Sequence, residues 1–286
     1  MPRWNFTTMA DPITPPDPRR TARQLSLVIL LMIVVGGVAM TLAARSRWWL
    51  PPVASTQGIE IDRLFYTTLV VTGIAFVLVH LVLALFVWMG GRRQTAAYWH
   101  DNRTLELTYT LTPAAILLTL VSMGAVVWGR IHAPPPENAL VVEVRAEQFG
   151  WFFRYPGADG TFGRVEPALI NARRNPLGLD PADPAGQDDI VARGGDLHLV
   201  VNRPVHVRLR SKDVLHSFFV PQFRVKQDAV PGVTIPVVFT PTRAGNFEIA
   251  CAELCGVGHY IMRGKITVES QAAFDAWLAG QQPAAP

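Results

Sequence analysis

Three long apolar stretches in the first half of the chain limit its possible folds more than any other feature. They cover residues 25–44, 67–90 and 111–131. About 20 consecutive apolar residues form a helix that crosses the hydrocarbon core of a bilayer, so each stretch can span a membrane. The first stretch ends in Leu42-Ala43-Ala44, which is also compatible with cleavage of a secretory signal peptide. An extra transmembrane helix and a cleaved signal therefore both stay open, and both place the next residues outside the cytoplasm.

The arginines indicate which way these stretches run across the membrane. The short loop after the second stretch holds Arg92, Arg93 and Arg103, and arginine-rich loops stay on the cytoplasmic side. The chain after the third stretch then lies on the opposite side. Residues 1–24 are polar and contain proline, and we expect them to form a disordered tail. The formal net charge of +4 reflects topology charges and a solvated surface, so it does not indicate a nucleic-acid partner.

After a stiff, proline-rich linker at residues 133–136 the pattern changes to that of a β domain. Short runs rich in branched and aromatic residues are separated by proline and glycine, which is typical of a sandwich or barrel. The expected strands are 140–144, 151–155, 197–201, 205–209, 234–239 and 247–251. We predict an all-β domain over residues 138–275 with a long loop at 167–194. A short helix at 274–278 and a flexible tail at 276–286 are expected at the end.

A cluster of sulfur and imidazole groups near the end of this domain indicates a metal site. Cys251 and Cys255 are the only cysteines, and His259 and Met262 follow closely, while His216 lies earlier in the chain. Thiolate, thioether and imidazole ligands together suit copper. A one-copper site of the blue-copper kind uses one cysteine, two histidines and an axial methionine. This sequence therefore offers that set and one further thiolate.

The second thiolate allows a pair of copper ions. Two thiolates can bridge two ions, each of which takes one histidine, while Met262 and the backbone carbonyl of Glu253 complete the coordination. A bridged pair can share one electron, and its bond lengths then change little on reduction, which suits an electron relay. Two alternatives stay open at this point. A Cys251–Cys255 disulfide is possible in an outward-facing domain but explains neither His259 nor Met262, and a Cys₂His₂ zinc site leaves Met262 without a role.

The string Cys-x-Glu-x-Cys-x-x-x-His-x-x-Met at residues 251–262 resembles the binuclear copper motif of cytochrome c oxidase subunit II. Residues 213–218 resemble the segment of that family that carries the first histidine ligand. Further family-like residues follow this segment, at Pro221, Lys226, Asp228, Pro231 and Gly232. The start of the family's second membrane helix is resembled by Glu106, Tyr109, Thr110 and Pro113. The similarity covers residues 58–275.

The resemblance implies an architecture and a function. The fold would be an α-helical membrane anchor, with two family helices and an N-terminal apolar segment, followed by an all-β cupredoxin-like Greek-key barrel. The chain would be the electron-transfer subunit of a respiratory cytochrome c oxidase, accepting electrons from cytochrome c at a binuclear copper centre. It would pass them to haem in the catalytic subunit, where oxygen is reduced. The implied partners are catalytic subunit I, subunit III and cytochrome c, at a bacterial-type inner membrane with the copper domain in the periplasm.

The resemblance also implies roles for individual residues. The copper ligands would be His216, Cys251, Glu253 through its carbonyl oxygen, Cys255, His259 and Met262. The Glu253 carboxylate would point towards a magnesium site shared with the catalytic subunit, because carboxylates are hard oxygen ligands that suit magnesium. Glu106 would lie at the cytoplasmic mouth of a proton route. The simpler interpretation is that Glu106 stabilises the start of a helix, where a negative charge interacts favourably with the helix dipole.

One departure from the family affects the predicted point where electrons enter. The family usually has Gln-Trp-x-Trp, in which the first tryptophan faces the donor, whereas this chain has Gln148-Phe149-Gly150-Trp151. Phenylalanine is harder to oxidise than tryptophan. Phe149 can still serve by stacking and proximity, and Trp151, expected in the core, is the other candidate.

Several further residues and rival functions complete these expectations. His80, inside the second apolar stretch, is expected to contact a neighbouring subunit. Glu143, Glu147 and Asp159 are expected on a solvated surface, where they could attract a basic donor.

A quinol oxidase subunit shares the fold but lacks the copper ligands, so the complete set of ligands in this chain disfavours that function. A membrane-anchored copper-storage or delivery protein stays an alternative, whereas the copper domain of nitrous oxide reductase accompanies a large propeller domain that this sequence lacks.

Overall fold

The structure is a computed structural model that describes residues 17–46, 49–93, 95, 98–171, 174–192 and 195–283. Most of the expected disordered tail, residues 1–16, and the last three residues, 284–286, lie outside this description. The described residues form two compact units, Met1–Leu50 with Tyr66–Leu118, and Pro51–Phe65 with Thr119–Pro286.

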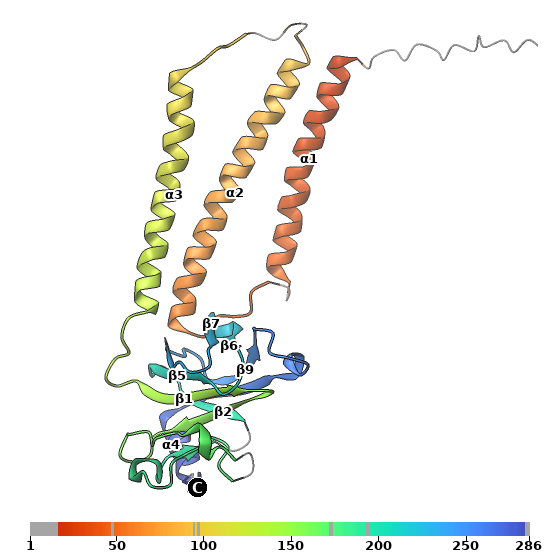
Figure 1. The fold of residues 1–286 in the computed structure, drawn as a ribbon. Helices are drawn as coiled ribbons and strands as arrows, with labels where there is room; N and C mark the ends of the chain where they lie inside the picture. The colour runs from red at the N-terminus through yellow and green to blue at the C-terminus, as the bar shows by residue number, and fades with distance from the viewer. Residues whose placement is uncertain are drawn as a thin grey trace, which may run out of the picture. The chain divides into compact units, whose positions relative to one another are not determined.

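Three long helices of the described chain, α1, α2 and α3, are long and apolar enough to cross a membrane (Figure 1). They are α1 (Pro18–Arg45), α2 (Thr56–Gly90) and α3 (Arg103–Ile131). Each helix begins before the apolar stretch that predicted it, because polar residues at the membrane surface can continue a helix whose hydrogen bonds are already formed. In α1 the side chain of Asp17 accepts a hydrogen bond from the Arg19 N–H, and Pro18 follows as the first helical residue. Residues 18–24, expected to be disordered, are therefore helical.

The β domain consists of two five-stranded sheets. Their orders are β3-β2-β1-β5-β8 and β4-β10-β9-β6-β7. The strands are β1 (Leu140–Glu147), β2 (Gly150–Tyr155), β3 (Ile190–Val191), β4 (Asp196–Val200), β5 (Val205–Ser211), β6 (His216–Val220), β7 (Val225–Ala229), β8 (Ile235–Phe239), β9 (Gly245–Cys251) and β10 (Arg263–Glu269). Consecutive strands such as β5 and β6 lie in different sheets, so the chain crosses repeatedly between the two layers. The predicted architecture, a helical membrane anchor followed by an all-β cupredoxin-like domain, is confirmed.

The two sheets enclose one hydrophobic core. In β5 the alternating residues Val205, Val207 and Leu209 are fully buried, while His206 and Arg208 between them are half-buried. This period of two is what a strand with one covered face requires. Phe153 of β2 and Phe218 of β6 belong to the same core, so residues of both sheets fill it.

The segment before α2 also belongs to the unit of the β domain, which the sequence did not indicate. Ala54 and Ser55 are fully buried. The Ala54 N–H donates to the Gln222 carbonyl at 2.8 Å, and the Ser55 hydroxyl donates to the Phe223 carbonyl at 2.7 Å. Because these bonds join residues that are far apart in the chain, no local pattern could have predicted them.

Buried ion pairs between side chains hold part of the segment that links β2 to β4 against the sheet. Arg154 of β2 forms ion pairs with Glu143 at 2.9 Å and with Asp189 at 3.0 Å, and all three side chains are buried. The prediction of a solvated Glu143 that attracts a donor is therefore wrong, since this carboxylate neutralises an arginine inside the protein. Glu147 is half-buried and pairs with Lys212 and Arg145.

The chain ends in a helix that packs on the domain. Helix α4 (Gln271–Ala279) begins after Ser270, whose hydroxyl accepts a hydrogen bond from the Ala273 N–H. Trp277 stacks on His198 of β4 with ring centroids 3.9 Å apart and an interplanar angle of 7°. The helix expected at 274–278 is therefore present and slightly longer, and residues 276–279, also assigned to the flexible tail, belong to it.

Candidate metal centre

The candidate ligands converge because two distant strands are neighbours in one sheet. Strand β6 pairs antiparallel with β9, with Phe218 opposite Cys251. The Ala252 N–H also donates to the Ser217 carbonyl at 3.1 Å. This pairing brings His216, at the start of β6, next to Cys251, at the end of β9. His216 and Cys251, which are 35 positions apart in the chain, are therefore neighbours in the sheet.

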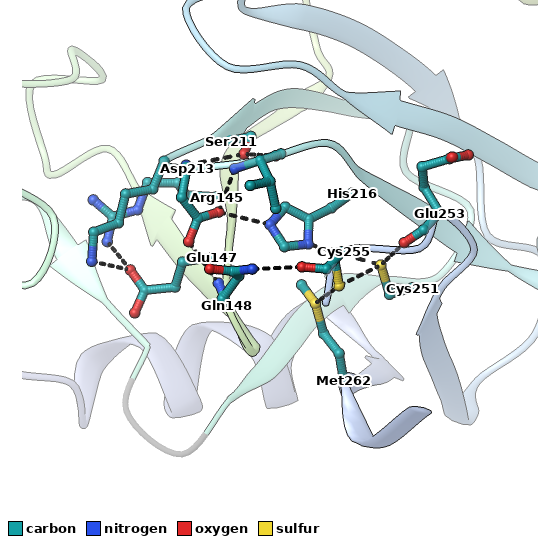
Figure 2. Close-up of polar contacts among 12 residues, drawn as sticks. Arg145, Glu147, Gln148, Ser211, Asp213, His216, Cys251, Glu253, Cys255 and Met262 are labelled. Atoms are coloured by element: carbon teal, nitrogen blue, oxygen red, sulfur yellow. Dashed lines mark hydrogen bonds and ion pairs between the residues drawn. The ribbon is translucent and has the colours of Figure 1, made fainter. Parts of the chain in front are cut away.

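The ligand atoms form a chain of short contacts (Figure 2). The two sulfur atoms of Cys251 and Cys255 are 3.8 Å apart. The Nδ1 atom of His216 lies 3.9 Å from the Cys251 sulfur, and Nδ1 of His259 lies 3.7 Å from the Cys255 sulfur. Each sulfur therefore has an imidazole of its own.

Each sulfur also has a weaker potential ligand of its own. The Met262 sulfur is 3.8 Å from the Cys255 sulfur, and the Glu253 carbonyl oxygen is 3.2 Å from the Cys251 sulfur. Figure 2 shows the Glu253 carboxylate pointing away from the two cysteines. All six side chains or carbonyls expected as ligands are thus together in one place.

Most of the centre is buried, although His259 is partly exposed, and this burial raises the pKa of the Cys255 thiol. His216 is fully buried, Met262 is 1% exposed, and Cys251 and Cys255 are 9% and 4% exposed. Burial raises the pKa of the Cys255 thiol to about 11, and the neighbouring Cys251 adds to the increase. A bound cation would reverse this by stabilising the thiolates. The ligand atoms of His216, Cys251 and Cys255 all lie within 4.8 Å of one another, and His259 and Met262 join this group through their contacts with Cys255. A set of thiols, imidazoles and a thioether fits a soft metal such as copper.

A disulfide is not formed in this arrangement. Both cysteines are free, and their separation of 3.8 Å is almost twice the length of about 2.05 Å of a disulfide bond.

Asp213 fixes the orientation of His216. The Asp213 carboxylate accepts a hydrogen bond from Nε2 of His216 at 2.8 Å, and the ring therefore turns Nδ1 towards the Cys251 sulfur. Burial alone would raise the pKa of Asp213, but hydrogen bonds from the Gln148 N–H, from His216 and from the Val214 N–H outweigh it, and the pKa lies below its usual range. The Asp213 carboxylate therefore stays ionised at neutral pH and accepts the hydrogen bond from His216.

Gln148 and Phe149 contact the loop that carries the remaining ligands. The Gln148 N–H donates to Asp213 at 2.9 Å, and the Gln148 side-chain amide donates to the Cys255 carbonyl at 2.6 Å. The Phe149 ring lies directly on Gly258, where an added Cβ would be 2.4 Å from the ring. No role at the centre was expected for Gln148, Asp213 or Gly258 from the sequence. The glycine next to His259 was the available signal.

The two candidates for electron uptake occupy different places. Phe149 is half-buried, between the surface and the loop from Cys255 to His259. Trp151 is 5% exposed and packs edge-on against His216 and Phe218, with ring centroids 6.5 and 5.8 Å apart. Phe149 is thus the more accessible of the two.

Two predicted residues lie in the other unit and are not part of this cluster. Glu106 is exposed in the first turn of α3. His80 of α2 has its Nδ1 atom 2.8 Å from the Phe76 carbonyl of the same helix.

Comparison with known proteins identifies the family. Residues 43–124 match the transmembrane domain of cytochrome c oxidase subunit II, and residues 182–270 match its periplasmic domain. The alternative cytochrome c oxidase subunit 2 of Bradyrhizobium diazoefficiens is 40% identical over 89% of this chain and 91% of its own length. Cytochrome c oxidase subunit 2 of Cereibacter sphaeroides is 30% identical over 79% of this chain and 78% of its own.

Among solved structures, the periplasmic domain of subunit II of cytochrome oxidase (CoxB) of Bradyrhizobium japonicum is 28% identical and covers 51% of this chain and 95% of its own, with a TM-score of 0.38. The sequence matches extend over both the membrane helices and the β domain. On these matches, the chain is an integral membrane protein that belongs to the cytochrome c oxidase subunit II family, the electron-transfer subunit of an oxidoreductase complex.

Proposed function

We propose that the β domain carries a binuclear copper centre held by His216, Cys251, the Glu253 carbonyl, Cys255, His259 and Met262. The single observation that carries this proposal is the pairing of each buried sulfur with its own imidazole, at 3.9 and 3.7 Å, while the sulfurs lie 3.8 Å from each other. One metal ion would need only one of these pairs. Two thiolates between two imidazoles supply bridging ligands for two ions.

The remaining ligands favour copper over zinc. A structural zinc ion takes four strong ligands in a tetrahedron, so it would leave the Met262 thioether and the Glu253 carbonyl unused. Weak axial ligands of these two kinds are typical of copper sites that transfer electrons. When bound, a thiolate-bridged copper pair supplies a centre that shares one electron over both ions and changes its bond lengths little on reduction.

The surrounding residues hold the ligands in place. Asp213 fixes the ring of His216, and Gln148 joins Asp213 to the carbonyl of Cys255. Phe149 packs on Gly258, beside His259. Ligands held in this way would keep their positions in both oxidation states, and the burial of His216, Cys251, Cys255 and Met262 would limit access of water to the centre.

We further propose that cytochrome c is the donor and that Phe149 is where electrons enter. Phe149 lies between the protein surface and the ligand-bearing loop, whereas Trp151 is enclosed in the core. A phenylalanine ring is hard to oxidise, so its role would be close contact between the donor and the centre. The full set of metal ligands favours this function over a quinol oxidase subunit.

The proposed partners and orientation follow the family. The β domain would face the periplasm of a bacterial-type inner membrane, since Arg92 and Arg93 follow α2 and Arg103 begins α3, at the opposite end of these spans. Catalytic subunit I and subunit III would be its neighbours. The outward-pointing Glu253 carboxylate would contribute to a magnesium site shared with subunit I, and Glu106 would lie at a proton route.

We also propose that residues 25–44 remain in the mature protein as a membrane span. The Ser26 hydroxyl donates to the Ala84 carbonyl of α2 at 3.0 Å, and Ser26 and Ala84 are both buried. A signal peptide that is removed needs no such fitted contact with the mature chain.

Metal analysis and electron paramagnetic resonance of the purified oxidase complex test the copper centre. We expect about two copper ions per chain in addition to any in the catalytic subunit, and a mixed-valence signal from them. Cys255→Ser should abolish the signal, while His206→Asn, a change on the neighbouring sheet, should leave it intact. Zinc in place of copper, or a single copper with a blue-copper spectrum, would contradict the proposal.

A further inference from the structure

Helices α1 and α2 pack closely through small residues. Ala22, Ser26 and Ala84 are buried in their contact. An added Cβ on Gly91 would lie only 2.2 Å from the Cβ of Ala22, so the two helices could not approach this closely with a larger residue there. Small residues of this kind allow membrane helices to pack tightly.

An apolar cavity of about 320 Å³ opens beside this contact. Leu27 and Leu30 of α1 and Leu81 and Leu85 of α2 line it. Arg23 and Trp88 line one end. The cavity has the lining that a hydrocarbon chain requires.

A second cavity of about 360 Å³ shares Arg23 and Trp88 with the first. Its other lining residues are Arg19, Gly91 and Arg92. The Arg92 guanidinium lies 3.7 Å from the centre of the Trp88 ring, which holds it beside the cavity. Within the described ranges, none of these three arginines forms an ion pair with a carboxylate.

The requirements of membrane topology explain why arginines lie at this end of the helices, but not why three of them meet. Arg20 and Arg93 would satisfy the same requirement, and neither lines either cavity. Arg19 and Arg23 are four residues apart and therefore lie on one face of α1. Their convergence with Arg92 creates an unneutralised positive site directly beside an apolar cavity.

We propose that these two adjoining cavities together form a binding site for one anionic phospholipid. Arg19, Arg23 and Arg92 would hold its phosphate, because guanidinium groups bind phosphate by strong, paired hydrogen bonds. One acyl chain would fill the cavity between Leu30 and Leu81. Basic pockets between membrane helices on the cytoplasmic side are suited to such headgroups. The proposal rests on the retention of α1 in the mature protein.

Native mass spectrometry of the purified oxidase, after detergent extraction and addition of phosphatidylglycerol or phosphatidylcholine, tests the site. The Arg19→Gln/Arg23→Gln variant should retain phosphatidylglycerol about tenfold less than the unmodified complex. The matched control is Arg20→Gln/Arg93→Gln, which removes the same charge from the same region and should retain the lipid. Equal loss in both variants would overturn the proposal, because general charge would then be sufficient.

Two further measurements test the acyl chain and the source of the phosphate. Leu81→Trp fills the apolar cavity and leaves the arginines intact, so it should also release the lipid, and retention would contradict the proposed chain position. Excess inorganic phosphate should not displace the lipid, and displacement would show a site for the free ion instead. Phosphatidylcholine bound as tightly as phosphatidylglycerol would also contradict the proposal.

The intact mass of the subunit separates this proposal from the copper proposal. If the measured mass shows that residues 18–45 have been removed, the lipid site is lost, while the copper content should be unchanged. A normal mass with bound phosphatidylglycerol and no copper signal would contradict only the proposed metal centre.

Discussion

Gly258→Ala tests the contact between Phe149 and the ligand-bearing loop. Gly258 has φ −94° and ψ 9°, a conformation that alanine can adopt, so only space opposes the substitution. The added Cβ would lie 2.4 and 2.5 Å from two carbon atoms of the Phe149 ring. The ring or the loop with His259 must therefore move.

The expected cost follows from that overlap. Overpacking of this kind costs about 1–3 kcal/mol, and loss of glycine from the unfolded chain returns about 0.4–1 kcal/mol. Gly280→Ala is the matched control, since Gly280 has φ −80° and ψ −9° and an added Cβ there has its nearest neighbour at an ordinary 3.4 Å. This control should keep or slightly raise the stability.

Thermal bleaching of the copper signal in the purified complex provides the assay. A change of 1 kcal/mol corresponds to a shift in Tm of about 2–4 °C for a domain of this size, so Gly258→Ala should lower the Tm by several degrees. In the background of Phe149→Ala the same change should cost close to nothing, because the overlapping ring is absent. A Tm for Gly258→Ala equal to that of the Gly280→Ala control, or an equal loss in both backgrounds, would refute the contact.

Three other predictions concern the side chains around the centre and the core. Asp213→Asn should weaken copper binding about 10- to 100-fold in a chelator competition, because one amide oxygen cannot replace the two carboxylate oxygens that accept from His216 and from the Gln148 N–H. Asp275→Asn on α4 should not weaken it, and equal affinities would count against this orientation. Arg154→Met should destabilise the β domain by about 3–5 kcal/mol in denaturant unfolding, because it leaves the buried carboxylates of Glu143 and Asp189 without their partner. The control Arg263→Met breaks an exposed pair with Glu248 and should cost less than about 1 kcal/mol. Similar costs for the two variants would show that the buried pairs are unimportant. Phe149→Ala should slow reduction by cytochrome c in stopped-flow measurements when the rate is expressed per bound copper, and Trp151→Phe should not; the reverse order would make Trp151 the point where electrons enter.

Much of the architecture and the ligand set could be predicted because their signals are local. Apolar length alone predicted the membrane helices, and the spacing of Cys251, Cys255, His259 and Met262 identified a metal-binding loop. Family membership, the electron-transfer role and the cupredoxin-like architecture are confirmed. The identity of the six copper ligands stays a prediction.

The remaining features depend on contacts between distant residues. Glu143 alternates along β1 like a surface residue, yet Arg154 of the adjacent strand and Asp189 of the following loop bury it. The bonds of Gln148 to Asp213 and Cys255 likewise join three segments far apart in the chain. Trp277 of α4 stacks on His198, which lies far away in the chain, so this contact could not be predicted. A single sequence carries no direct sign of such pairings.

The most direct test of the copper centre is anomalous X-ray scattering from crystals of the purified oxidase, recorded at the copper and zinc edges. We predict two copper peaks in the β domain, both between the sulfurs of Cys251 and Cys255, with one imidazole beside each. A single peak, a signal at the zinc edge only, or density joining the two sulfurs directly would contradict the account.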